Sequence, residues 1–183
     1  NALVAAPQPA ILTLVAKDFS YDLPPQLDAG LTKIVFKNQG AEPHHAQFAR
    51  IKDDVTNEQL AAALQQGPDA ALPLVTLPGG PAVIDPGQSE EVTINLTPGR
   101  YVVLCFVTSH DGVAHAAKGM VSMAEVVDSK ARPAATPKAD LVITLRDFAF
   151  DMPAELHAGQ QTWRVVNEGP QPHELSLIKL AEG

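Results

Sequence analysis

Short stretches of the chain alternate apolar and polar residues, which is the pattern of a half-buried β-strand. In one of them Ile34 and Phe36 share one face, and Lys33 and Lys37 lie on the other. Strands are predicted over residues 11–16, 31–37, 46–51, 91–96, 101–107 and 121–127. The turn Pro98-Gly99 predicts that the strands 91–96 and 101–107 form a hairpin. The pattern indicates an all-β fold.

One segment has helical rather than strand character. The sequence Thr56-Asn57-Glu58-Gln59 is typical of a capping box, and residues 60–66 consist of Ala, Leu and Gln, which are strong helix formers. Gly67-Pro68 ends this helix. Residues 72–87 are dense in Pro and Gly and predict a long loop.

Composition narrows the possible functions. The 183 residues are 45% hydrophobic and 5% aromatic, with 16 prolines and 12 glycines, which suits short strands joined by many turns. A net charge of -8 argues against nucleic acid as a partner. No apolar run approaches the length of a membrane span. No paired carboxylates, Ser-His-Asp arrangement or phosphate-binding glycine pattern supports a hydrolase or a nucleotide-binding protein, and no catalytic residue is predicted.

Metal-ligating side chains gather in one stretch near the end of a predicted strand. Cys105, the single cysteine, precedes His115 and Met120 on one loop. A mononuclear electron-transfer copper takes two imidazoles and a thiolate with a weak axial thioether, because soft sulfur stabilises Cu(I) and imidazole tolerates both oxidation states. His44, which follows the strand 31–37, can supply the second imidazole.

These residues resemble the cupredoxin family. In that family the first copper histidine follows a proline after a turn with Asn and Gly, as Pro43 precedes His44 here, and Cys, His and Met arrive late on one loop. The resemblance implies a Greek-key β-sandwich with one short helix that binds one copper ion. The implied ligands are His44, Cys105, His115 and Met120. Nine residues separate Cys105 from His115, which is longer than in small blue proteins and closer to copper nitrite reductases, so the spectral class stays open.

The remaining residues near these ligands have less specific interpretations. His45 either orients the site through hydrogen bonds or is a further copper ligand, which would make the centre richer in imidazole. His110 precedes Asp111-Gly112 and is expected in an exposed turn. Glu42 and Lys118 flank the implied ligands and are expected to be solvated.

The end of the sequence repeats its beginning. Asp18-Phe19 recurs as Asp147-Phe148, and Pro43-His44 recurs as Pro172-His173, with the same offset, so the two stretches align without a gap. We therefore expect a cupredoxin-like domain over 1–128, a linker over 129–138 and a partial second copy over 139–183 without a ligand loop. Further chain or another subunit is expected to complete the copy, and His173 is not expected to be a ligand.

Three functions are compatible with the sequence. The first is a one-electron carrier outside the cytoplasm whose partner is a redox protein, with a cationic docking surface complementing the acidic chain. The second is a copper oxidoreductase acting on superoxide; a nitrite reductase or multicopper oxidase is disfavoured because Leu104 and Phe106, rather than a histidine, flank Cys105. The third is a copper-binding or surface-assembly module, which suits residues 138–183 better than residues 1–130.

Overall fold

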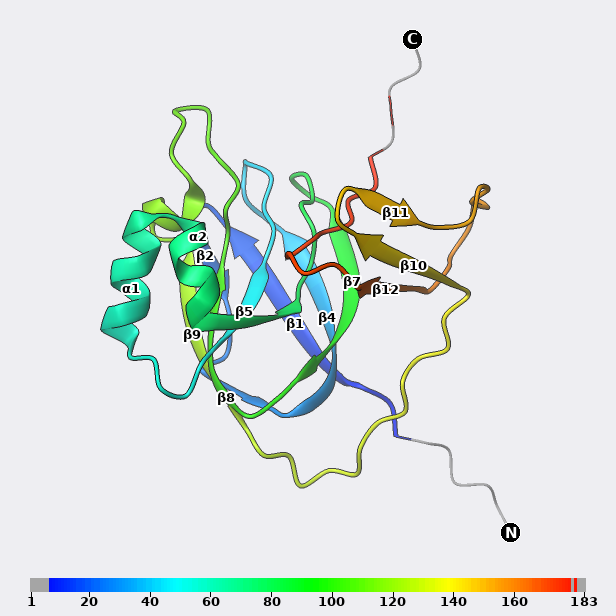
Figure 1. Ribbon diagram of the computed structural model, residues 1–183, viewed down its shortest axis with the longest axis horizontal. Coiled ribbons are helices and arrows are strands. Elements are labelled where there is room, and N and C mark those ends of the chain that lie inside the picture. Colours follow the sequence, from blue (N-terminus) through cyan, green and yellow to red (C-terminus); the bar gives the residue numbers. More distant parts are fainter. Residues whose placement is uncertain (1–6, 179, 181–183) are drawn as a thin grey trace. The chain divides into compact units, whose positions relative to one another are not determined.

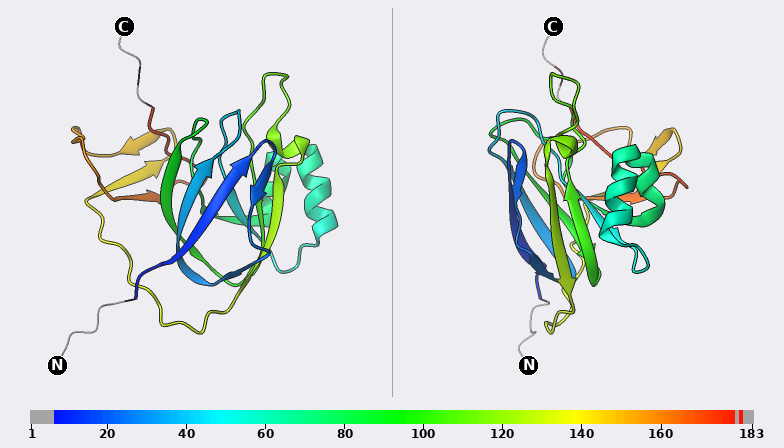
Figure 2. Two further views of the ribbon diagram at one scale, coloured as in Figure 1. Left: turned by 180° about the vertical axis from the view of Figure 1, so that it is seen from behind. Right: turned by 90° about the vertical axis from the view of Figure 1, so that its left-hand side faces the viewer.

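A computed structural model describes residues 7–178 and residue 180 of the chain. The chain divides into two compact units, Asn1–Ala135 (unit 1) and Thr136–Gly183 (unit 2). In unit 1 two β-sheets lie face to face (Figures 1 and 2). The predicted all-β sandwich is confirmed. No helix in the described part of the chain is long and apolar enough to cross a membrane.

The first sheet of unit 1 has the strand order β2-β1-β4-β7. Its strands are β1 (Ala10–Lys17), β2 (Ser20–Asp22), β4 (Gly30–Asn38) and β7 (Ser89–Leu96). β1 and β4 run parallel, and Ile34 of β4 lies opposite Leu12 of β1 and Val92 of β7. This register places the apolar residues of neighbouring strands on the same face.

The second sheet has the order β3-β9-β8-β5-β6. Its strands are β3 (Gln26–Asp28), β5 (Gln47–Ile51), β6 (Val75–Gly79), β8 (Gly99–Leu104) and β9 (Val121–Val127). Phe48 of this sheet and Phe36 of the first are both fully buried in the core between the sheets. Burying a side chain of this size contributes about 1.5–3 kcal/mol.

The predicted hairpin between the strands 91–96 and 101–107 is wrong. β7 pairs with β4 in the first sheet, and β8 lies between β5 and β9 in the second. The chain crosses from one sheet to the other at Thr97, whose backbone N–H donates to the Tyr101 hydroxyl at 3.1 Å. Strands on opposite walls of the core alternate in the same way as the strands of a hairpin, so the pattern alone does not distinguish them.

The predicted helix is α1 (Asn57–Gln66). Thr56 Oγ1 accepts the Gln59 N–H at 3.2 Å, and Gln59 Oε1 accepts the Thr56 N–H at 2.8 Å, which confirms the capping box. Buried residues of the helix, Leu60 and Ala63, belong to a second apolar cluster with Val102 of β8. The helix therefore covers the outer face of the second sheet.

The segment 72–87 is more ordered than a loop. After Gly67 the chain forms the short helix α2 (Pro68–Ala71) and the 3-10 turn η1 (Leu72–Leu74), and then β6. β6 contains Pro78 and lies at the edge of its sheet. A proline is tolerated there because one side of an edge strand needs no backbone donor.

Unit 2 contains the strands β10 (Leu141–Arg146), β11 (Ala149–Asp151) and β12 (Trp163–Asn167) in the order β11-β10-β12. β10 and β12 run parallel with Leu141 opposite Trp163. In the register of the sequence repeat, the corresponding positions of unit 1 are Leu12 and Ile34, which also lie opposite each other. The pairing of these strands is therefore the same in both units.

The capping box generates a stability prediction. Thr56→Ala removes the hydroxyl that accepts the Gln59 N–H, and we expect it to lower the free energy of unfolding by about 1 kcal/mol. Thr56→Ser keeps the hydroxyl and should unfold close to the wild-type midpoint. Urea denaturation of the three proteins measures the difference, and equal stability of all three would contradict the role of the cap.

Candidate metal centre

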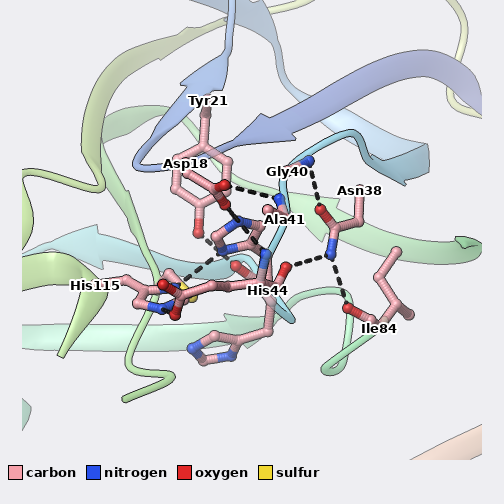
Figure 3. Close-up of polar contacts among 11 residues, drawn as sticks. Asp18, Tyr21, Asn38, Gly40, Ala41, His44, Ile84 and His115 are labelled. Carbon is pink, nitrogen blue, oxygen red and sulfur yellow. Dashed lines mark hydrogen bonds and ion pairs between the residues drawn. The ribbon is translucent and has the colours of Figure 1, made fainter. Parts of the chain in front are cut away.

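A folded turn after β4 positions the first histidine. The Asn38 side chain organises this turn: Nδ2 donates to the carbonyls of Glu42 (2.8 Å) and Ile84 (3.0 Å), and Oδ1 accepts the Gly40 N–H at 2.9 Å (Figure 3). The backbone of His44 pairs with Ile84, whose carbonyl accepts the His44 N–H at 3.1 Å and whose N–H donates to the His44 carbonyl at 2.9 Å. The position of the His44 ring therefore depends on a hydrogen-bonded frame.

The other donors lie on the loop between β8 and β9. β8 ends at Leu104, earlier than predicted, because the backbone of Cys105 bonds to its own loop: its N–H donates to the Met120 carbonyl at 3.3 Å, and its carbonyl accepts the Ala116 N–H at 2.8 Å. The Met120 N–H donates to the His115 carbonyl at 2.9 Å. These bonds tie the three potential ligands of the loop to one another.

His44, Cys105 and His115 meet inside the core. The two Nδ1 atoms of His44 and His115 are 3.0 Å apart, and Cys105 Sγ is 3.5 Å from His115 Nδ1. All three donor atoms lie within 4.8 Å of one another, and the three residues are fully buried. Met120 is also fully buried and belongs to the same core cluster as Cys105. In the described part of the chain this is the one such group of His, Cys and acidic residues.

Each imidazole is hydrogen-bonded to a carboxylate through its outer nitrogen. His44 Nε2 is 2.7 Å from Asp18 Oδ1, and His115 Nε2 is 3.0 Å from Glu42 Oε2 (Figure 3 shows the Asp18 pair). An ionised carboxylate can only accept hydrogen bonds, so both Nε2 atoms carry the hydrogen, and Nδ1 of each ring in its neutral form presents a lone pair.

Two lone pairs that face each other at 3.0 Å repel unless a cation lies between them. The inner nitrogens and the Cys105 sulfur therefore fit a metal ion. Two imidazoles, one thiolate and a nearby thioether are the donor set that selects copper.

Burial and hydrogen bonding set the charges of the site. Burial lowers the pKa of His44 despite the hydrogen bond to Asp18, so the free ring is neutral at pH 7. Burial opposes ionisation of Asp18, but hydrogen bonds from the Ala41 N–H and from His44 lower its pKa. Burial raises the pKa of the Cys105 thiol, so metal binding must release this proton.

His45 contacts the backbone of the neighbouring loop rather than the group formed by His44, Cys105 and His115. Its Nε2 accepts the backbone N–H of Phe106 at 2.6 Å, and its carbonyl accepts the hydroxyl proton of Tyr21. Burial, with the neighbouring rings of His115 and His44, lowers its pKa to about 4, which matches a neutral ring that accepts a hydrogen bond. His110 lies in an exposed turn, as expected.

Sequence reasoning missed the two carboxylates. Glu42 was expected to be solvated, but its side chain is only 25% exposed and contacts His115. Asp18 lies far before His44 in the sequence and is brought to it by folding. One signal was present: Asp18 is among the residues that recur in the repeat, as Asp147.

Unit 2 repeats this histidine and carboxylate pair. His173 Nε2 is 2.7 Å from Asp147 Oδ1, the same separation as in the pair of His44 and Asp18. The turn is also repeated, because Asn167 Nδ2 donates to the Gln171 carbonyl at 2.7 Å and Asn167 Oδ1 accepts the Gly169 N–H at 2.9 Å. The metal-binding group described above does not include His173.

No protein-family model and no curated protein matches the sequence. Several solved structures are similar. Auracyanin from the photosynthetic bacterium Roseiflexus castenholzii is 23% identical over 66% of this chain and 99% of its own, with a TM-score of 0.45. Auracyanin A, described as a "blue" copper protein from Chloroflexus aurantiacus, is 20% identical over 66% and 99%, with a TM-score of 0.40. An azurin from Methylomonas sp. strain J is 14% identical over 64% and 98%, with a TM-score of 0.43.

The sequence identities and TM-scores of these structures are low. We therefore infer the chemistry of the site from the donor atoms of this chain alone. Unit 1 has two facing sheets, and its core gathers two imidazoles, a thiol and a thioether. It is a two-sheet β-sandwich with a candidate site for one metal ion.

The geometry around Gly40 generates a prediction. A Cβ at this position would overlap the Asp18 carboxylate and His44 Nε2, so Gly40→Ala must displace at least one member of this pair. We expect copper affinity, measured by competition titration, to fall by on the order of 10- to 100-fold. Gly169→Ala introduces the same overlap with Asp147 and His173 in unit 2 and should leave copper affinity unchanged. Equal affinity of both variants would contradict the prediction.

Proposed function

We propose that the protein is a one-electron carrier whose copper ligands are His44, Cys105, His115 and Met120. The observation that carries this proposal is the meeting of a buried thiol with two imidazole nitrogens that are 3.0 Å apart. Copper in this donor set cycles between Cu(II) and Cu(I) and so stores one electron.

The scaffold suits a carrier because it restricts movement of the donors. Backbone hydrogen bonds join Cys105, His115 and Met120 within their loop, and His44 is paired with Ile84. The donors are also packed in a core that both sheets contribute to. A centre that changes little between oxidation states has a small reorganisation cost, which favours fast electron exchange.

The surface beside His115 is the proposed docking site for a redox protein. The Phe19 ring contacts the His115 ring with centroids 4.8 Å apart, and Lys118 Nζ lies 4.8 Å from the Phe19 centroid. Lys118 also pairs with Asp111 at 2.8 Å. The net charge of -8 favours a partner with a cationic surface.

Superoxide turnover is the less favoured function. It requires an open coordination position that an anionic substrate can reach, but the three donors are fully buried and the chain is acidic. A centre richer in imidazole would need His45, whose Nε2 instead accepts the Phe106 N–H.

We further propose that unit 2 arose by duplication of the first part of unit 1 and that the protein works outside the cytoplasm. The constant offset of the repeat, which holds for strand pairing and for the histidine and carboxylate pairs, supports the duplication. A copper thiolate is better preserved away from the competing thiols of the cytoplasm, which supports the location.

Spectroscopy of copper-loaded protein tests the carrier. We expect an intense thiolate-to-copper absorption band in the visible region, which Cys105→Ser abolishes because serine offers no sulfur. His44→Gln should weaken copper binding strongly, whereas His45→Gln should keep the band because its oxygen can still accept the Phe106 N–H.

A pale wild-type protein whose spectrum is the same in Cys105→Ser would contradict the proposal. Loss of copper from His45→Gln, with retention in His44→Gln, would instead assign His45 as the ligand.

A further inference from the structure

The carrier proposed above leaves two partly buried contacts of its proposed ligands unexplained. Both imidazoles that face the centre have a carboxylate on their outer nitrogen, Asp18 on His44 and Glu42 on His115. We propose that these two carboxylates are positioning residues, which fix the ligating nitrogen of each imidazole and hold the reduction potential of the copper low. This inference rests on the proposed function, because it concerns the same site.

The Asp18 carboxylate is itself held in place before any metal binds. Its Oδ2 accepts the Ala41 N–H at 2.7 Å, and its Oδ1 accepts the Glu42 N–H at 3.4 Å. Because Oδ1 is also 2.7 Å from His44 Nε2, the carboxylate links β1 and its following turn to the turn that carries the histidine. The His44 ring cannot rotate without losing a charge-assisted hydrogen bond.

Glu42 applies the same restraint to the other ligand. It lies on the turn before His44, but its side chain reaches across to His115 Nε2 at 3.0 Å. His115 is fully buried, and the Glu42 side chain is 25% exposed. Glu42 therefore lies where the outer edge of the His115 ring would otherwise meet solvent.

The two carboxylates should both lower the reduction potential of the copper. A carboxylate that accepts the Nε2 proton increases electron density on the ring, which makes Nδ1 a stronger donor. A stronger donor and a nearby negative charge both stabilise Cu(II) more than Cu(I). The Asp18 and Glu42 side chains are only partly exposed, so water screens their charges less than those of fully exposed carboxylates. Their stabilisation of Cu(II) is stronger for this reason.

Neutral variants separate charge from hydrogen bonding. Asp18→Asn and Glu42→Gln keep an oxygen that can accept a hydrogen bond from the Nε2–H group but lose the negative charge. We expect each variant to shift the reduction potential to more positive values and to lower Cu(II) affinity by on the order of 10- to 100-fold. Cu(I) affinity should fall less, and each tenfold difference between the two losses equals a shift of about 59 mV.

The chain offers two matched controls. Asp147→Asn neutralises the same pair in unit 2, where His173 is 2.7 Å from the carboxylate. Asp111→Asn neutralises a carboxylate on the ligand loop that pairs with Lys118 rather than with an imidazole. Neither control should move the potential as far as Asp18→Asn or Glu42→Gln, because neither removes a charge bonded to a ligand.

A second measurement needs no metal. In metal-free protein, ¹⁵N spectra of the imidazoles should show hydrogen on Nε2 of both His44 and His115. Asp18→Ala removes the acceptor and should shift the His44 ring toward a mixture of the two neutral forms, while His115 keeps its hydrogen on Nε2.

The outcomes distinguish the two proposals. A thiolate band in the wild type with unchanged potentials in both Asp18→Asn and Glu42→Gln would overturn this inference and leave the carrier intact. Absence of that band would overturn the carrier, and the metal-free spectra would still decide whether the carboxylates fix the rings. Hydrogen on Nδ1 in the wild type would overturn the positioning role directly.

Discussion

The close approach of two imidazole nitrogens is the constraint on which this site depends. His44 Nδ1 and His115 Nδ1 lie 3.0 Å apart inside a core, and in neutral rings whose Nε2 atoms carry the hydrogen both would present lone pairs. Lone pairs at this distance repel each other, so the arrangement costs free energy unless a proton or a metal ion lies between the two nitrogens. The scaffold must oppose that cost, and it does so with hydrogen bonds on the opposite side of each ring.

Those bonds explain why the site is built from such distant segments. The turn after β4 supplies one proposed ligand, His44, the Glu42 carboxylate that contacts the other proposed ligand, His115, and backbone donors for Asp18. A change in this turn would therefore affect both imidazoles together. The ligand loop is independently braced by the backbone bonds of Cys105. The two halves of the site meet only when the two sheets pack.

The sequence was informative where the signal was local. The period-two pattern, the capping box at Thr56 and the order of Cys105, His115 and Met120 can each be recognised within a few residues. Strand pairing is not local, so β7 and β8 were wrongly expected to form a hairpin although they lie in opposite sheets. The contacts of Asp18 and Glu42 were missed for the same reason, because a solvated carboxylate and one that contacts a buried ring cannot be distinguished in the sequence.

Unit 2 shows which part of the structure is needed to form the histidine and carboxylate pair. It has the paired His173 and Asp147 at the same 2.7 Å, yet its described residues include no cysteine. The histidine and carboxylate pair is therefore a property of the parallel strands and the asparagine-centred turn, and it forms in a unit that has no cysteine of its own. In unit 1 the ligand loop meets a histidine whose outer nitrogen is already occupied. The remaining nitrogen, Nδ1, then faces the core, where Cys105 and His115 lie within reach.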